Sequence, residues 1–408
     1  MKNSILPIVI LTGILILVSA IFVFSQDWTQ WRGANRDGKV SGFTVPKEWP
    51  SSLNRKWSVT VGVGDATPAL AGDKLFSFTR VGENEVLLCL DAASGKELWR
   101  NEYPAQAVTG PASRHPGPRS SPTVANGKVI TLGVTGILSC LDESSGKVIW
   151  RNEEYAGTVP KFFTSMSPIV ADGMCIAHLG GSEGGAVIAF DLASGAQKWK
   201  WAGDGPSYSS PVIMTVDRVK QLVIQTENNL MGVALPDGKL LWQVATPAER
   251  RHYNCATPIV DDRTVIYTGQ GTGTKAIEIQ KQGEAFTAKE LWSNEEIGTA
   301  FNTPVLKDGL LFGLSDRSIF YCMNARNGQV AWSDTTKHDI FGSVLDAGSV
   351  LLALTPQSEL FAFQPDGKKY TEVARIKIAD TPTYAHPVIS GNRIYTKDDE
   401  MLTLWMLQ

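Results

Sequence analysis

The sequence has no excess of positive charge, because 38 lysines and arginines oppose 41 acidic residues in 408, for a net charge of −3. Without an excess of basic residues the protein has little to attract the phosphates of a nucleic acid, so the composition argues against nucleic-acid binding. The five cysteines form no C-x-x-C pair, no adjacent pair and no C-x-x-C-H motif, which excludes that type of haem attachment. The glycine-rich stretch 269–273 leads into strand-like residues rather than a helix, so it lacks the helix N-terminus of a phosphate loop.

Long apolar runs are confined to the first residues. After Lys2, residues 5–24 carry no charge, and Val23 and Ser25 place small residues at −3 and −1 of a cleavage after Ser25. Residues 1–25 are therefore predicted to be a signal peptide, with an uncleaved membrane anchor as the alternative. No cysteine ends the run, so a lipoprotein anchor is not supported. Either outcome predicts an exported, periplasmic or extracellular protein.

A turn motif ending in tryptophan repeats along the chain, as in Asp91-Ala-Ala-Ser-Gly-Lys-Glu-Leu-Trp99. The tryptophans follow one another at roughly 40 to 50 residues, a spacing typical of propeller blades. Each is predicted to end the last strand of a blade and to fill the wedge between neighbouring sheets. These structural positions are Trp57, Trp99, Trp150, Trp199, Trp242, Trp292 and Trp332. In the unit after Ser343, Gly367-Lys-Lys-Tyr370 is interpreted as placing a tyrosine at this position.

A second marker, a hydroxyl residue followed by proline and two apolar residues, precedes each unit. Proline at the start of a strand removes no ladder hydrogen bond, so the marker predicts where each innermost strand begins. Seven copies keep the marker position with proline, and Ser343 occupies the eighth without it. We therefore predict an all-β, eight-bladed β-propeller of four-stranded blades over residues 57–408. Residues 26–56 are predicted to be a leader that packs on it.

The patterns at the two ends of the repeat region predict how the ring closes. The last unit contains three strands' worth of residues, and residues 54–60 resemble the final strand of a unit that lacks its beginning. Pairing this N-terminal strand with the C-terminal blade would remove two open sheet edges.

The tandem Leu-Asp-x-x-Ser-Gly-Lys-x-x-Trp copies resemble the repeats of the pyrroloquinoline-quinone-type β-propeller family. The leader, from Trp28-Thr-Gln-Trp31-Arg-Gly to Gly38, resembles the start of its secreted members. The resemblance implies either a quinoprotein alcohol dehydrogenase or a non-enzymatic platform like the BamB lipoprotein of outer-membrane-protein assembly. The enzymes use Ca²⁺ held by oxygen ligands and usually an adjacent Cys-Cys pair, which this sequence lacks.

Candidate binding residues lie in the loops before the hydroxyl-Pro markers, which should surround the channel on one face. His178, before a glycine-rich turn, is expected on the same face. The candidates for a ligand or partner face are His115, Arg119, His178, Tyr208, His252, Asn254, Asn302, Tyr384 and His386. The alternative interpretation is that short loops simply collect polar residues. No two histidines share ligand spacing, so no metal site is predicted.

Arg119 has two interpretations that the residues leave open. In Gly117-Pro-Arg-Ser-Ser-Pro122 it is held on a stiff loop, where it could grip a carboxylate. It could equally tie adjacent blades together through backbone carbonyls.

The sequence thus predicts an exported, non-enzymatic platform that binds an envelope protein or a small molecule. No catalytic residue and no cofactor are expected. The alternative function is a dehydrogenase that oxidises an alcohol or sugar with pyrroloquinoline quinone and Ca²⁺.

Overall fold

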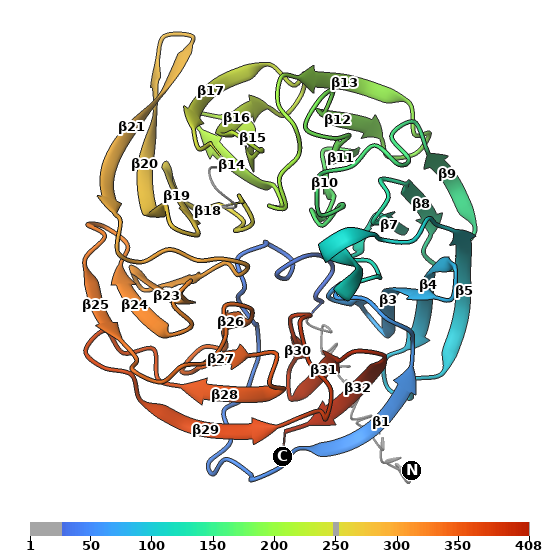
Figure 1. The fold of residues 1–408 in the computed structure, drawn as a ribbon, viewed down its shortest axis with the longest axis vertical. Helices are drawn as coiled ribbons and strands as arrows, with labels where there is room; N and C mark the ends of the chain where they lie inside the picture. Colours follow the sequence, from blue (N-terminus) through green and yellow to red (C-terminus); the bar gives the residue numbers. More distant parts are fainter. Residues whose placement is uncertain (1–26, 248–252, 408) are drawn as a thin grey trace, which may run out of the picture.

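The computed structural model describes residues 27–247 and 253–407. The predicted signal peptide and His252 lie outside these ranges. Within them, 32 strands form eight four-stranded antiparallel sheets arranged as a ring (Figure 1). The prediction of an all-β, eight-bladed propeller is confirmed. No helix in the described ranges is both long and apolar enough to cross a bilayer.

The first four blades follow the leader in chain order. Blade 1 contains β2 (Ala69–Ala71), β3 (Lys74–Val81), β4 (Asn84–Asp91) and β5 (Glu97–Pro104). Blade 2 contains β6 (Thr123–Ala125), β7 (Lys128–Leu132), β8 (Leu138–Asp142) and β9 (Val148–Asn152). Blade 3 contains β10 (Ile169–Ala171), β11 (Met174–Leu179), β12 (Ala186–Asp191) and β13 (Gln197–Ala202). Blade 4 contains β14 (Val212–Val216), β15 (Val219–Gln225), β16 (Asn229–Ala234) and β17 (Leu240–Ala245).

The remaining four blades complete the ring. Blade 5 contains β18 (Ile259–Asp261), β19 (Thr264–Gly269), β20 (Gly273–Gln282) and β21 (Ala285–Asn294). Blade 6 contains β22 (Val305–Lys307), β23 (Leu310–Leu314), β24 (Phe320–Asn324) and β25 (Val330–Ser333). Blade 7 contains β26 (Ser343–Asp346), β27 (Leu351–Leu354), β28 (Glu359–Phe363) and β29 (Glu372–Lys377). Blade 8 contains β30 (Val388–Ser390), β31 (Arg393–Lys397), β32 (Met401–Met406) and β1 (Asn54–Thr60).

Blade 8 closes the ring as predicted. The N-terminal strand β1 pairs antiparallel with β32, in a register that runs from Asn54 opposite Met406 to Thr60 opposite Met401. The pairing joins the two ends of the propeller and leaves no gap between blade 8 and blade 1.

The hydroxyl-Pro markers set the start of the inner strands and join neighbouring blades. Strands β6 and β10 each begin at the residue after the marker proline. The amide N–H of Ser121 donates to the Ser167 hydroxyl at 2.9 Å, and the amide of Ser167 donates to the Ser210 hydroxyl at 2.9 Å. The same contact links Thr257 to the Thr303 hydroxyl. Side-chain hydroxyls thus satisfy backbone donors between neighbouring inner strands, where the short β-ladders leave them free.

The repeated tryptophans join each outer strand to the next blade. They lie near the start of the outer strands rather than at their end, contrary to the prediction, since Trp99 is the third residue of β5 and Trp150 the third of β9. Trp99 Nε1 donates to the Glu143 carbonyl of blade 2 at 3.2 Å. An ideal Cβ at Gly146, in the same turn, would lie 2.4 Å from the Trp99 ring, so only glycine fits beneath it. Trp57, Trp150, Trp199, Trp292 and Trp332 also donate to a carbonyl of the following blade.

Trp242 is the exception, because blade 5 lacks the short glycine turn. Its indole N–H donates at 2.7 Å to Gln221 Oε1 of its own blade. Where the other blades turn, β20 and β21, of ten residues each, continue as a hairpin that projects from the rim (Figure 1).

Tyr370 does not take the tryptophan position in blade 7, contrary to the interpretation from sequence. In blades 1 to 6 the tryptophan pairs with a small residue, as Trp99 does with Cys89. In blade 7, Ala374 pairs with Ala362 at this place. Tyr370 instead lies before β29, with its ring 5.7 Å from that of Trp332.

The leader crosses the centre of the ring and fills one end of the channel (Figure 1). Arg32 is 1% exposed and donates to the carbonyls of Thr303 and Pro304 at 2.8 and 2.9 Å. Arg36, 4% exposed, donates to the carbonyls of Ser167, Pro168 and Pro211 on the other side of the channel. Burial lowers the pKa of Arg32 to about 10 and that of Arg36 to about 9, so both stay charged at neutral pH.

Candidate functional site

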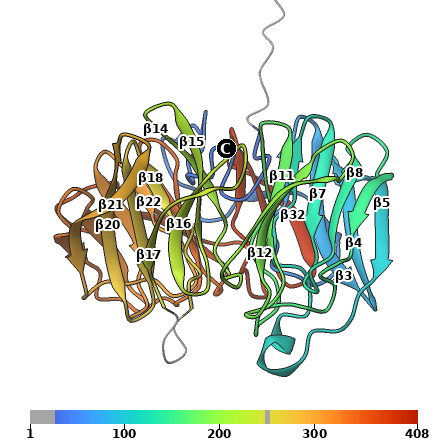
Figure 2. The ribbon, with the colours of Figure 1, turned by 90° about the horizontal axis from the view of Figure 1, so that it is seen from above.

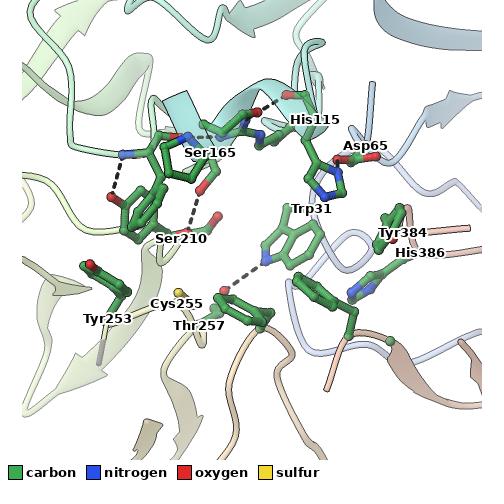
Figure 3. A pocket seen from close by; sticks show the side chains of 18 residues that line it. Trp31, Asp65, His115, Ser165, Ser210, Tyr253, Cys255, Thr257, Tyr384 and His386 are labelled. Atoms are coloured by element: carbon green, nitrogen blue, oxygen red, sulfur yellow. Dashed lines mark hydrogen bonds and ion pairs between the residues drawn. The ribbon is translucent and has the colours of Figure 1, made fainter. Parts of the chain in front are cut away.

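A cavity of about 350 Å³ lies on the channel axis (Figure 3). The loops that precede the inner strands of all eight blades contribute side chains to it. Trp31 of the leader lies at its centre, where its indole N–H donates to Thr257 Oγ1 at 2.9 Å. The short 3-10 helix η1 (Gly110–Arg114), which supplies Ala112 to the lining, sits at one end of the ring, and the leader lies toward the other (Figure 2). The leader therefore closes the channel beneath the cavity.

Aromatic rings line the cavity in two groups. In the first, the Phe162 and Tyr253 rings meet edge to face at 5.1 Å, and Tyr208 lies 5.8 Å from Tyr253. In the second, Phe301 and Phe341 stack at 4.4 Å with an interplanar angle of 9°. Tyr384 extends this second group, 5.4 Å from Phe341 and 4.7 Å from the His115 ring. Such rings offer large apolar faces to whatever enters.

The single carboxylate in the described lining belongs to Asp65. Its Oδ2 lies 2.7 Å from His115 Nδ1, so this carboxylate already has a partner (Figure 3). Asp65 precedes the first marker by two residues, and backbone hydrogen bonds to Pro118 hold it beside the loop that carries His115.

Arg119 ties loops of two blades together. Its Nη2 donates to the carbonyls of His115 and Ala112 at 2.8 and 3.2 Å, and Nη1 donates to the Phe162 carbonyl of the next loop. Nε has no hydrogen-bond partner although it is buried. Burial lowers the pKa of the guanidinium. The structure therefore shows the blade-tying role, and one donor is left over.

His386 lies against the tryptophan floor. It is 4% exposed, and its ring lies 4.4 Å from that of Trp31. Burial lowers its pKa to about 3, and the nearby Arg32 charge acts in the same direction. The side chain is thus neutral at physiological pH, and its Nδ1 has no hydrogen-bond partner.

Five of the nine candidate residues come together around this cavity: His115, Arg119, Tyr208, Tyr384 and His386. Asn254 and Asn302 are buried outside the lining, where their amide groups donate to backbone carbonyls of Thr226 and Leu314. His178 is also buried outside it, with Nε2 3.0 Å from the Asp204 carbonyl, and burial lowers its pKa to about 4. His252 lies outside the described residues.

The candidate set omitted several lining residues, namely Trp31, Asp65, Phe162, Ser165, Tyr253, Cys255, Phe301 and Phe341. Applying the marker rule to the first blade would have found Asp65, which precedes Thr67-Pro68 in the same way. No local signal identifies Trp31, because it reaches the cavity from a leader far from the loops that it meets.

The letters G-x-S-x-G occur at residues 180–184, but the structure gives them a different role from a nucleophile elbow. The stretch joins the antiparallel strands β11 and β12 rather than a strand and a helix. The Ser182 hydroxyl donates to Glu227 Oε1 at 3.0 Å.

The described lining does not fit a Ca²⁺-bound quinone. Such a clamp requires several carboxylate and amide oxygens around the metal. Asp65 is the one carboxylate lining the cavity in these ranges, and it is paired with His115. Across the described residues, no cluster of three or more His, Cys, Asp and Glu side chains could hold a metal ion. We therefore derive no chemical step through that cofactor.

Comparisons with known proteins agree on the fold. The family described as outer membrane protein assembly factor BamB matches residues 36–130 and 112–334. The outer membrane protein assembly factor BamB of Yersinia pestis is 24% identical over 300 residues, covering 70% of this chain and 71% of its own length. The crystal structure of BamB from Moraxella catarrhalis superposes with a TM-score of 0.65 at 14% identity, covering 87% of this chain and 98% of that one.

An enzyme has the same fold. A europium-containing methanol dehydrogenase superposes with a TM-score of 0.74 at 12% identity, over 94% of this chain and 98% of its own. At this identity the similarity shows the propeller alone, so it does not decide function. The family match spans most of the chain, and the pyrroloquinoline-quinone-type propeller anticipated from the repeats is confirmed. This chain belongs to the family of the outer membrane protein assembly factor BamB.

Proposed function

We propose that this protein is an exported, non-enzymatic binding platform of the cell envelope, which engages an envelope protein through the face that carries the central cavity. Residues 1–25 direct its export and are either cleaved or kept as an anchor. Its membership of the BamB family supports a role in the envelope. The partner is a protein whose apolar or aromatic side chain enters the cavity.

The observation that carries this proposal is the convergence of all eight blade loops on one aromatic cavity. Aromatic pockets of this kind anchor partner side chains, because rigid rings bury a large area at little entropic cost. Phe301 is 40% exposed and stacks on Phe341 at the cavity, so it offers a partner a preformed apolar contact.

The polar groups of the cavity favour binding over catalysis. His386 is neutral and buried, and Arg119 is engaged by three carbonyls. The thiol of Cys255 is a poor nucleophile, because burial raises its pKa to about 12.

Site-specific photo-crosslinking in the native host tests the proposal. A photoreactive residue in place of Phe301 should crosslink to one envelope protein. The same residue in place of Val148, which is 41% exposed on outer strand β9, serves as the matched control. Equal adducts from both positions, or none from Phe301, would contradict the proposed binding face.

The alternative, a quinone-dependent dehydrogenase, is tested by titrating the purified protein with pyrroloquinoline quinone and Ca²⁺. Tryptophan fluorescence and a dye-linked assay of alcohol and sugar oxidation report the result. We expect neither saturable quenching nor turnover. Ca²⁺-dependent quenching accompanied by turnover would replace the platform with an oxidoreductase.

A further inference from the structure

Phe301, Phe341 and Tyr384 form an aromatic surface at the cavity that is partly open to solvent, and we call it the aromatic rim. Its members precede the inner strands of blades 6, 7 and 8. Phe301 is 40% exposed and stacks on Phe341 at 4.4 Å, and Phe341 meets Tyr384 edge to face at 5.4 Å. Large apolar groups exposed side by side are typical of a contact site, so the rim is a surface on which a partner can dock.

Carboxylates from three loops surround the aromatic rim. Burial and the negative charges of Asp65, Asp339 and Asp399 raise the pKa of Tyr384. Asp339 lies two residues before Phe341, and its Oδ1 accepts the amide N–H of that residue at 3.0 Å. Asp399 lies in the exposed turn between β31 and β32. Blades 1, 7 and 8 therefore each bring a negative charge to the same ring.

Two of these carboxylates have no positive partner. Asp65 is paired with His115 at 2.7 Å and also lies near the charge of Arg119. Among the residues that the structure describes, Asp339 and Asp399 make no ion pair. The other oxygen of Asp339, Oδ2, accepts a hydrogen bond from the neutral side-chain amide of a neighbouring turn at 3.0 Å. Asp339 and Asp399 are thus able to pair with a cation that arrives from outside.

The cations of this region are directed to the backbone rather than to the two unpaired carboxylates. Lys397 is 1% exposed, and its Nζ donates to the carbonyls of Asp398 and Asp399 at 3.0 and 3.1 Å. Lys337 and Lys377, on neighbouring loops, also donate to backbone carbonyls. These lysines stabilise turns, and none of them covers the rings of the aromatic rim.

An arginine side chain matches ring faces and unpaired carboxylates at the same time. Its guanidinium is planar, stacks on aromatic rings and donates paired hydrogen bonds to a carboxylate. A lysine ammonium can pair with a carboxylate but has no flat face to stack. An acidic side chain would be repelled by Asp339 and Asp399. The chemistry of the rim therefore selects a guanidinium.

We propose that the envelope partner docks an arginine on the aromatic rim, with the guanidinium packed on the rings and donating to the Asp339 carboxylate, while Asp399 adds attraction. This inference rests on the proposed function in treating the cavity face as the docking face. It adds the charge that the partner must carry beside the apolar side chain that enters the cavity.

Three fluorescein-labelled pentapeptides test the proposal on the purified protein. The first is Gly-Arg-Leu-Arg-Gly, and in the others citrulline or glutamate replaces both arginines. Because citrulline keeps the planar shape but lacks the charge, fluorescence anisotropy at about 50 mM salt should show the arginine peptide binding about fivefold more tightly than the citrulline peptide. About 500 mM salt should reduce this ratio. Equal affinities, tighter binding of the glutamate peptide, or no saturable binding of the arginine peptide at millimolar concentration would overturn the proposal.

Asp339→Asn tests the pairing carboxylate, since asparagine keeps an oxygen that can accept the Phe341 N–H. Glu183→Gln is the matched control, because it removes the same charge from an exposed turn between β11 and β12, beside the loop that precedes β14. We expect Asp339→Asn to bring the affinities of the arginine and citrulline peptides close together and Glu183→Gln to leave their ratio unchanged. The same ratio in both variants would show that net charge holds the peptide, and the assignment to the rim would be wrong.

Asp399→Asn gives a second test that does not depend on the folding of the first variant, because its turn is exposed. It should weaken the arginine peptide about twofold and leave the citrulline peptide unchanged, and an unaltered arginine affinity would contradict the proposal. Failure of the peptide series together with intact crosslinking from position 301 would refute the arginine anchor alone. Arginine selectivity without a specific crosslink from position 301 would refute only the envelope partner.

Discussion

At the leader end of the channel, Arg32 and Arg36 donate to carbonyls from opposite sides of the ring, and packed backbone surrounds them. At the cavity end, Arg119 also donates to carbonyls, but it lines an open cavity, while Nε is unpartnered in Arg32 and Arg119 alike. The same residue type thus closes one end of the channel and lines an open cavity at the other. The difference lies in what surrounds each guanidinium, since all three bond to backbone.

Removing a leader guanidinium should have the largest effect. Arg36→Met leaves the buried carbonyls of Ser167 and Pro211 without the Arg36 donor, and that of Pro168 with the Thr123 hydroxyl alone. We expect a loss of about 3 kcal/mol or more in the free energy of unfolding. Urea denaturation measures it, with Arg114→Met as an exposed control that should change little. Equal midpoints for the two variants would show that the leader does not hold the closed end together.

Lowering the pH should reduce the free energy of unfolding through His386, which lies between the leader residue Trp31 and the cavity. Its pKa is about 3 in the folded protein against 6.5 ordinarily, so below pH 6.5 the unfolded chain takes up a proton that the folded one does not. Stability therefore falls as the pH drops from about 6.5 toward 3. Between pH 6 and 4, His386→Gln should lose about 1.4 kcal/mol less per pH unit than the wild type in urea denaturation. Parallel pH profiles would contradict the buried neutral state.

A smaller effect is expected at the contact that positions the Arg119 loop. An ideal Cβ at Gly117 would lie 2.2 Å from the Val63 carbonyl oxygen, so Gly117→Ala must move one loop and should cost about 2 kcal/mol. Gly110→Ala is the control, because its Cβ would meet nothing within 4 Å and only its φ of +64° resists alanine, at about 1 kcal/mol. Thermal denaturation compares the two, and equal losses would mean that the loops can separate freely.

The smallest effect on stability is expected at the mouth of the cavity. Phe301→Ala removes a 40% exposed ring, and we expect a loss below about 1 kcal/mol in the unfolding free energy. Val305→Ala, at a fully buried position in the inner strand of the same blade, should cost more in urea denaturation. If Phe301→Ala proved the more destabilising, the stacked pair would be part of the core rather than a binding surface.

The blade plan could be predicted because each of its signals is local. A hydroxyl-Pro marker and a turn ending in Trp99 fall within one repeat, and their spacing sets the strands. The same locality explains the error at Tyr370: counting from the turn glycine finds an aromatic residue, whereas the β-ladder places Ala374 opposite Ala362. Blade 5 lacks the turn motif before Trp292 because its β20–β21 hairpin continues past the place where the other blades turn.

The candidate site could be predicted only in part. The marker rule identifies the loops that reach the axis, and His115, Arg119 and Tyr208 lie at the cavity. It cannot distinguish them from Asn254 and Asn302, because a polar side chain in such a loop can face the axis or satisfy a backbone carbonyl behind it. The outcome depends on which carbonyls the neighbouring blade leaves unpaired.

The sequence by itself determined the eight blades, their closure by residues 54–60 and the face on which the loops gather, because repeat spacing and strand patterning act over short distances. The tertiary structure alone decided that Trp31 forms the cavity floor, that Asp65 pairs with His115 and that Arg119 ties two blades while keeping a free donor. These contacts join residues far apart in the chain, and they exist only after closure brings eight loops and the leader to one axis.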